Sequence, residues 1–239
     1  MPFLKSITLK QTEQIVGYPV NIPAFLNGIN IDVRTNVTLF VGENGSGKST
    51  LLEAIATLCG FNMTGGGRNH CYNQDEPQTH SELANNIKLS WFPKVTTGFF
   101  MRAESFFNFA TYLDDVADYG NKSLHAQSHG ESFLSLFTNR MQKGIYLLDE
   151  PEAALSPQRQ LSFMTIIHDL ETAGKAQFII ATHSPMLLCY PQATILNFGE
   201  DGITEVAHYT ETEHYRITKT FLDAPERYFQ YLFSDEESE

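Results

Sequence analysis

The sequence is poor in cysteine and in long apolar runs, and each shortage excludes a class of protein. Its three cysteines, Cys59, Cys71 and Cys189, are odd in number and lack C-x-x-C spacing. This indicates free thiols in a reducing compartment rather than a disulfide scaffold. No stretch approaches the roughly 18 apolar residues that span a membrane, and the first ten residues lack the apolar core of a signal peptide. We therefore expect a cytoplasmic protein with no membrane insertion.

Positive charge is scarce as well. Lysine and arginine number 16 against 28 acidic residues, which gives a formal net charge of -12. An acidic surface repels nucleic-acid phosphates and anionic lipids, and the basic residues are scattered, so direct nucleic-acid binding is doubtful. The chain does contain 42% hydrophobic residues, 18 of them phenylalanine, over 239 residues. This composition predicts a globular chain with a sizeable core and argues against disorder.

Apolar runs alternate with helical patterns along most of the chain. Buried strands are predicted at 36–42, 144–150 and 175–185, and further strands at 3–10, 29–33, 87–92 and 96–103. Helical spacing occurs at 48–60, with Gly60 as a C-cap, and at 155–174, with Ser156 as an N-cap. Residues 193–207 resemble a hairpin that turns around Glu200 to Gly202. This alternation predicts an α/β domain with a mostly parallel sheet.

Three segments depart from this alternation. Residues 61–86 are rich in glycine, asparagine and histidine without a sustained period, which predicts a long irregular insert. Residues 104–142 carry two further helical patterns and are expected to form a small helical lobe. The acidic end, 234–239, is expected to be a disordered tail. We expect a single domain over residues 1–239 that includes all three.

A glycine-rich loop follows the predicted strand at 36–42. Its residues 42–49, GENGSGKS, fit the pattern GxxxxGK[ST], in which backbone N–H groups wrap phosphates that no side chain keeps away. Lys48 can reach the β- and γ-phosphates, Ser49 can ligate Mg²⁺, and Thr50 can contact the α-phosphate. The predicted ATP-binding residues are Gly42, Asn44, Gly45, Ser46, Gly47, Lys48, Ser49 and Thr50.

Two carboxylates and a histidine complete the predicted catalytic machinery. Asp149 ends a buried strand, where ligands gather in open α/β sheets, so Ser49 and Asp149 are the predicted metal residues. Because metal binding needs only one carboxylate, Glu150 can orient or deprotonate a water that attacks the γ-phosphate. His183 follows another buried strand and can donate a hydrogen bond to that phosphate. Lys48, Glu150 and His183 are therefore the predicted catalytic residues.

The stretch SHGES, residues 128–132, heads a predicted helix and has no place in ordinary P-loop kinases or GTPases. The sequence resembles the ABC-type ATPases in the order of its motifs, which are GENGSGKST, SHGES, LLDEPE, AALS and ATHSP. It is most similar to small soluble ATPases related to the structural-maintenance-of-chromosomes and RecF-like group. The resemblance covers about residues 37–200. It implies a P-loop NTPase with a mostly parallel sheet, an antiparallel β subdomain and a small helical lobe.

The resemblance also implies an ATP-dependent homodimer in which each site is shared. Ser128 and Gly130 correspond to the family's signature loop, which contacts the γ-phosphate bound by the partner subunit. His129 stands where the family has glycine, and its role is open. Two further positions are also open: Arg102 or Glu104 for the Q-loop, and Tyr18 or Phe25 for stacking on adenine.

The function implied by this resemblance is Mg²⁺-dependent ATP hydrolysis that drives an unidentified protein partner, of the DNA-maintenance or defence type. The alternative is the ATP-binding subunit of an ABC transporter. A transporter subunit is expected to carry a Q-loop glutamine, and no glutamine ends the predicted strand at 96–103.

Overall fold

The computed structural model describes residues 1–10, 17–63, 65–67, 81–102, 134 and 143–233. Its main sheet has six strands in the order β5-β6-β7-β3-β8-β9. The first five strands of that order run parallel, and β9 pairs with β8 in the antiparallel sense. In chain order they are β3 (Val37–Val41), β5 (Gly98–Arg102), β6 (Gly144–Asp149), β7 (Ala176–Ala181), β8 (Thr194–Gly199) and β9 (Gly202–Val206).

A second, smaller sheet is antiparallel. It contains β2 (Asn30–Asp32), β1 (Leu4–Leu9) and β4 (Ile87–Trp91) in that order. The predicted α/β fold with a mostly parallel sheet and an antiparallel subdomain is therefore confirmed. The hairpin predicted around Glu200 to Gly202 is also confirmed, because Gly199 of β8 pairs with Gly202 of β9. The predicted helical lobe at 104–142 and the acidic tail lie almost wholly outside the described residues.

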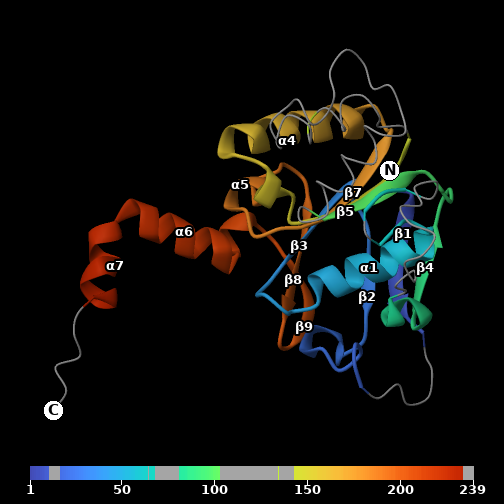
Figure 1. Ribbon diagram of the computed structural model, residues 1–239, viewed down its shortest axis with the longest axis horizontal. Helices are drawn as coiled ribbons and strands as arrows, with labels where there is room; N and C mark the ends of the chain where they lie inside the picture. The colour runs from blue at the N-terminus through green and yellow to red at the C-terminus, as the bar shows by residue number, and fades with distance from the viewer. Residues whose placement is uncertain (11–16, 64, 68–80, 103–133, 135–142, 234–239) are drawn as a thin grey trace, which may run out of the picture.

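Helices cover both faces of the main sheet (Figure 1). Helix α1 (Lys48–Cys59) packs between the two sheets, in a core that includes Phe40, Leu51 and Ile87. Helices α4 (Pro157–Thr172) and α5 (Pro185–Leu188) cover the opposite face of the main sheet. Since successive side chains of a strand point to opposite faces, Val37, Leu39 and Val41 of β3 belong to the second core while Phe40 belongs to the first. All five residues of β3 are buried for this reason.

Two predicted helix caps agree with the structure, whereas α4 ends two residues before the predicted end at 174. Helix α1 ends at Gly60, whose φ of 73° is left-handed and whose N–H donates to the carbonyls of Ala56 and Thr57. Helix α4 starts after Ser156 as N-cap, although the Ser156 side chain makes no capping hydrogen bond. The described residues also form short 3₁₀ helices: η1 (Pro23–Phe25), η2 (Glu82–Asn85), η4 (Pro151–Ala154) and η5 (Tyr209–Glu211). Of these, η2 lies inside the segment predicted to be irregular and packs on α1.

Two further helices follow η5, in a segment where the sequence pattern was not used to predict an element. Helices α6 (Glu213–Asp223) and α7 (Pro225–Leu232) bury no residue and extend away from the sheets (Figure 1). Apolar residues at 217, 221, 222, 228, 229 and 232 recur at helical spacing, so the pattern that predicts these helices is present in the sequence. Within the described ranges, no helix is both long enough and apolar enough to cross a bilayer.

Gln177 of β7 joins the two sheets. Its side chain is fully buried, its Oε1 accepts hydrogen bonds from the backbone N–H groups of Phe3 and Leu4 at 2.9 and 2.8 Å, and its Nε2 donates to the Leu4 carbonyl at 3.1 Å. Three backbone groups at the start of the small sheet therefore depend on one side chain from the large sheet.

Replacing Gln177 with leucine should destabilise the protein. The substitution keeps the volume but leaves buried polar groups unpaired, at a cost of about 1–3 kcal/mol each. We expect the free energy of unfolding in urea to fall by about 2–5 kcal/mol. Gln158→Leu on the exposed surface of α4 is the matched control and should leave it nearly unchanged. Equal urea midpoints of unfolding for Gln177→Leu and Gln158→Leu would contradict this role of Gln177.

Candidate functional site

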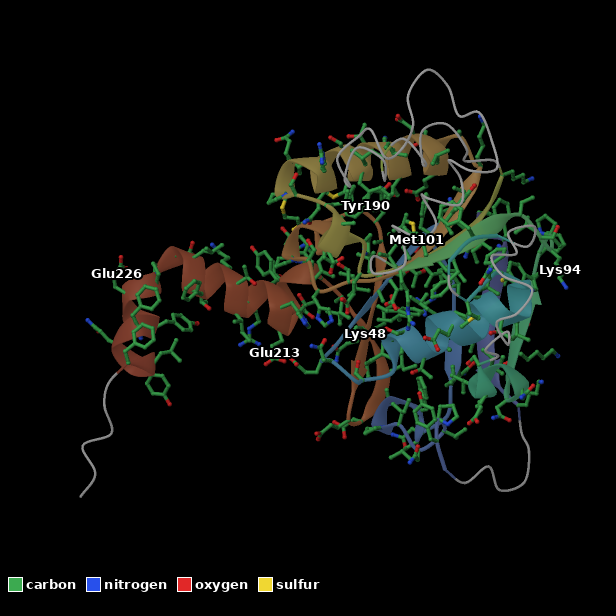
Figure 2. All side chains as sticks on the ribbon, viewed as in Figure 1. Lys48, Lys94, Met101, Tyr190, Glu213 and Glu226 are labelled. Atoms are coloured by element: carbon green, nitrogen blue, oxygen red, sulfur yellow. The ribbon has the colours of Figure 1, made fainter. Side chains whose placement is uncertain are left out.

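The predicted site residues come together at one edge of the main sheet. Strands β6, β7 and β3 are neighbours and run parallel, so their carboxyl ends meet at this edge. Asp149 ends β6, His183 follows β7, and the glycine-rich loop follows β3. The loop then leads directly into α1, whose first residue is Lys48 (Figure 2). The structure therefore brings the loop, both carboxylates and the histidine together at the carboxyl ends of the strands.

Two glycines in the loop are required by backbone conformation and by packing. Gly42 has a φ of 138°, and a Cβ there would lie 2.5 Å from the Phe198 carbonyl oxygen. Gly47 has a φ of 104°, and a Cβ there would lie 2.8 Å from the Phe25 ring. Both values of φ are unfavourable for any residue with a side chain. The loop is thus pressed against an aromatic pair, Phe25 and Phe198, whose ring centroids are 6.3 Å apart.

Lys48 is a buried cation inside the loop. Its side chain is only 4% exposed, and its Nζ donates to the carbonyl oxygens of Gly42 and Glu43 at 2.7 and 2.9 Å. Burial lowers the pKa of Lys48, and the carboxylates of Glu150 and Asp149 oppose that shift. The ammonium group is therefore held inside a loop whose sequence pattern is that of a phosphate-binding loop. The Ser46 Oγ is also buried there, without a hydrogen-bond partner among the described residues.

The two predicted metal residues contact each other directly. The Ser49 hydroxyl donates to Asp149 Oδ1 at 3.0 Å. Burial raises the pKa of Asp149, and the Arg102 guanidinium opposes that shift. A hydroxyl and a carboxylate are oxygen ligands of the kind that Mg²⁺ prefers, so these residues fit the metal. Ser49 and Asp149 would hold Mg²⁺, which neutralises phosphate charge when bound.

Arg102 links Asp149 to α1, which the sequence did not predict. It ends β5 opposite Asp149, donates from Nε to Asp149 Oδ2 at 3.0 Å, and forms an ion pair with Glu53 of α1. Sequence reasoning left Arg102 and Glu104 open for the Q-loop position. In the structure Arg102 contacts a predicted metal residue, whereas Glu104 lies outside the described residues.

Glu150 differs from its neighbour in both backbone and exposure. Its φ of 51° is left-handed, which is uncommon for a residue with a side chain, and its N–H donates to the Ala181 carbonyl at 2.9 Å. Asp149 is buried, whereas the Glu150 side chain is 48% exposed and its Oε1 lies 3.6 Å from His183 Nε2. The carboxylate is thus open to water while it faces the site.

His183 is fixed through both its backbone and its ring. Its N–H donates to Glu152 Oε1 at 2.6 Å, and the N–H of Ser184 donates to the same oxygen at 3.1 Å. Its Nδ1 lies 2.7 Å from Nε2 of His214. Burial, with the nearby Lys48 and His214, lowers the pKa of His183, so the ring is neutral near pH 7. Sequence reasoning missed Glu152 and His214; the acidic run in LLDEPE hints at Glu152, but nothing in the sequence pairs His214 with His183.

Several predicted positions are placed differently or lie outside the described residues. Phe25 is buried against Gly47 and belongs to the core, whereas Tyr18 is 69% exposed, so Tyr18 is the exposed one of the two candidates for stacking on adenine. Asn44 and Gly45 lie on the exposed part of the loop, and Thr50 is half-buried. The signature-loop residues Ser128, His129 and Gly130 lie outside the described residues.

This combination of sheet, loop and carboxylates is that of a P-loop NTPase, and comparisons with known proteins agree. A family profile described as an AAA domain matches residues 20–145, more than half of the chain. A second profile matches residues 133–188 and is described as an AAA domain of candidate AbiEii toxins from type IV toxin–antitoxin systems. The chain therefore belongs to the AAA domain family, and its fold is that of an ABC-type ATPase.

Three similar proteins are described as ABC transporter components or candidates for them. A protein of Onion yellows phytoplasma (strain OY-M), described as a candidate ABC transporter ATP-binding protein, is 27% identical over 203 residues. The match covers 75% of this chain but only 34% of that protein, so the chain spans about a third of the relative's length. A structure described as a candidate metal-chelate type ABC transporter in an inward-facing conformation matches with a TM-score of 0.51 at 16% identity, covering 90% of this chain and 88% of that one. CbiO1 of Clostridium perfringens, part of an ABC transporter complex, matches with a TM-score of 0.50 at 17% identity, covering 96% and 100%. At these identities the two structures show a shared fold.

Proposed function

We propose that the protein binds ATP and Mg²⁺ and hydrolyses the ATP. The observation that carries this proposal is the position of buried Lys48 within the loop, beside the Ser49–Asp149 pair. The loop N–H groups and Lys48 bind and orient the phosphates. Glu150, exposed to water and facing His183, takes the proton of the attacking water, and His183 donates from its ring to the γ-phosphate.

We further propose that two copies close head to tail around two ATP molecules. In this arrangement Ser128 and Gly130 of one copy contact the γ-phosphate held by the loop of the other. The family resemblance supports this proposal, and the exposed edge at Glu43, Asn44 and Gly45 leaves the loop accessible. Hydrolysis would then release the dimer and move a protein partner, because the described residues contain no second catalytic group of this kind.

Mixing two inactive variants tests the shared site. Lys48→Ala removes the cation of the loop, and Ser128→Arg blocks the signature contact. In a mixed dimer one composite site carries both changes and the other carries neither, so mixing should restore up to about half of the activity per dimer. The measurement is ATP turnover as a function of the mixing ratio, with each variant alone as a control. If mixed dimers form without any rescue, a crosslinked dimer with a single change decides between unshared sites and two sites that must act together.

The alternative function, the ATP-binding subunit of an ABC transporter, is favoured by the relatives' descriptions. The two functions differ in the partner. A transporter subunit would co-purify with an integral membrane protein, whereas the leading proposal predicts a partner that is not embedded in a membrane. Affinity purification from detergent-solubilised cells, followed by identification of the stoichiometric partner, separates the two.

A further inference from the structure

The first turn of α6 brings the C-terminal helices to the proposed nucleotide site. Thr212, the N-cap of α6, is buried, and its hydroxyl donates to the Tyr209 carbonyl at 2.6 Å. Tyr209 in turn packs edge-on against Tyr215, with ring centroids 5.0 Å apart. Figure 2 shows Glu213 at the end of α6 nearest the sheets, and Glu226, near the start of α7, beyond the other end of α6. Within the described residues, the start of the helical arm formed by α6 and α7 is therefore held against the body.

His214, the second residue of α6, is the arm's contact with the site. Its Nε2 lies 2.7 Å from His183 Nδ1, and the ring centroids are 4.8 Å apart at an interplanar angle of 55°. The distance is that of a hydrogen bond, in which one ring nitrogen donates and the other accepts. A neutral imidazole carries a single N–H, so the direction of this bond decides which nitrogen of His183 bears its proton.

The surroundings of His183 Nε2 decide which of the two histidines donates this hydrogen bond. This nitrogen is buried, has no hydrogen-bond partner among the described residues, and lies 3.6 Å from the Glu150 carboxylate. If His183 donated from Nδ1, the lone pair on Nε2 would face a carboxylate and, in the proposed function, a phosphate. If His214 donates instead, Nε2 carries the proton and faces both anions as a donor. Electrostatics therefore favours His214 as the donor.

We propose that His214 is a positioning residue that donates from Nε2 to His183 Nδ1 and so holds His183 in its Nε2–H tautomer. Glu152 fixes the backbone of His183, while His214 fixes the rotation and the tautomer of its ring. The value of that tautomer for catalysis rests on the proposed function. Because His214 belongs to α6, the helical arm becomes part of the site, and a displacement of α6 would release the His183 ring.

The tautomer can be measured without nucleotide. Long-range ¹H–¹⁵N spectra of histidine-labelled protein distinguish protonated from unprotonated ring nitrogens, and His183→Gln identifies the His183 signals. We expect His183 to be protonated on Nε2 and not on Nδ1 in the wild type. His214→Leu, which has no donor, should lower the share of the Nε2–H tautomer, because Glu150 alone then favours it. A wild-type His183 protonated on Nδ1, or a tautomer unaffected by His214→Leu, would overturn the proposal.

Kinetics provides the second readout. His214→Leu should lower kcat about 10-fold, the worth of one hydrogen bond, and leave ATP affinity unchanged. His214→Gln should keep most of kcat because its amide Nε2 can donate to the same nitrogen. His168→Leu, on the exposed surface of α4, is the matched control and should not change kcat. Equal losses in the Gln and Leu variants would show a merely structural role and overturn the proposal. If the wild type hydrolyses no ATP, the proposed function fails, while the spectra still decide the inference about His214.

Discussion

Glu150→Gln should bind ATP and Mg²⁺ normally and turn ATP over at least about 100-fold more slowly, the usual loss when a general base is removed. The structure supplies the physical reason. Asp149 is buried and bonded to Ser49 and Arg102, so it is not free to accept a proton from water. Glu150 has a left-handed backbone and a half-exposed carboxylate that lies 3.6 Å from His183. An amide in its place keeps the shape but accepts no proton.

The measurement for Glu150→Gln is single-turnover ATP hydrolysis together with size-exclusion chromatography. Because the variant binds ATP without consuming it, we expect it to accumulate an ATP-bound dimer that the wild type forms only transiently. Asp201→Asn in the exposed turn between β8 and β9 makes the same chemical change away from the site and should leave turnover unchanged. Wild-type turnover in Glu150→Gln would assign the base to another residue.

Lys48→Ala should weaken ATP binding by about 10- to 100-fold, which corresponds to the loss of a charge-assisted contact with the phosphates. Lys48 is the buried cation of the loop, and its Nζ already lies between the carbonyls of Gly42 and Glu43, so little side-chain entropy is lost on binding. Lys48→Met retains the apolar stem and should show the same loss, which separates the effect of charge from that of packing.

Equilibrium titration with a fluorescent ATP analogue measures this effect. Lys94→Ala is the matched control, because Lys94 is exposed and lies far from Lys48 in the view of Figure 2. Lys94→Ala also removes one positive charge from the protein, and its affinity for the ATP analogue should stay near that of the wild type. Unchanged affinity in both Lys48 variants would contradict the phosphate-binding role of the loop.

The parts of the site that the sequence predicted are those encoded within short segments. The loop at 42–49, the end of β6 at Asp149 and the histidine after β7 each follow from a local pattern of apolar residues ending in a polar motif. Parallel strands then bring their carboxyl ends to one edge, so three separate motifs predict one site. The roles assigned to Ser128 and Gly130 came from family resemblance alone, and they remain predictions.

The sequence by itself determined the mostly parallel α/β fold, the glycine-rich loop, and the placement of Asp149 and Glu150 at the end of a buried strand. Periodicity, glycine conformation and chain order are local properties, which explains why they can be read along the chain. The tertiary structure decided which of Tyr18 and Phe25 is buried, that Arg102 bonds to Asp149, that Gln177 joins the two sheets, and that His214 reaches His183. Each of these features depends on the packing of segments that are distant in the sequence. In each, a polar or aromatic side chain contacts a residue that no local sequence pattern specifies.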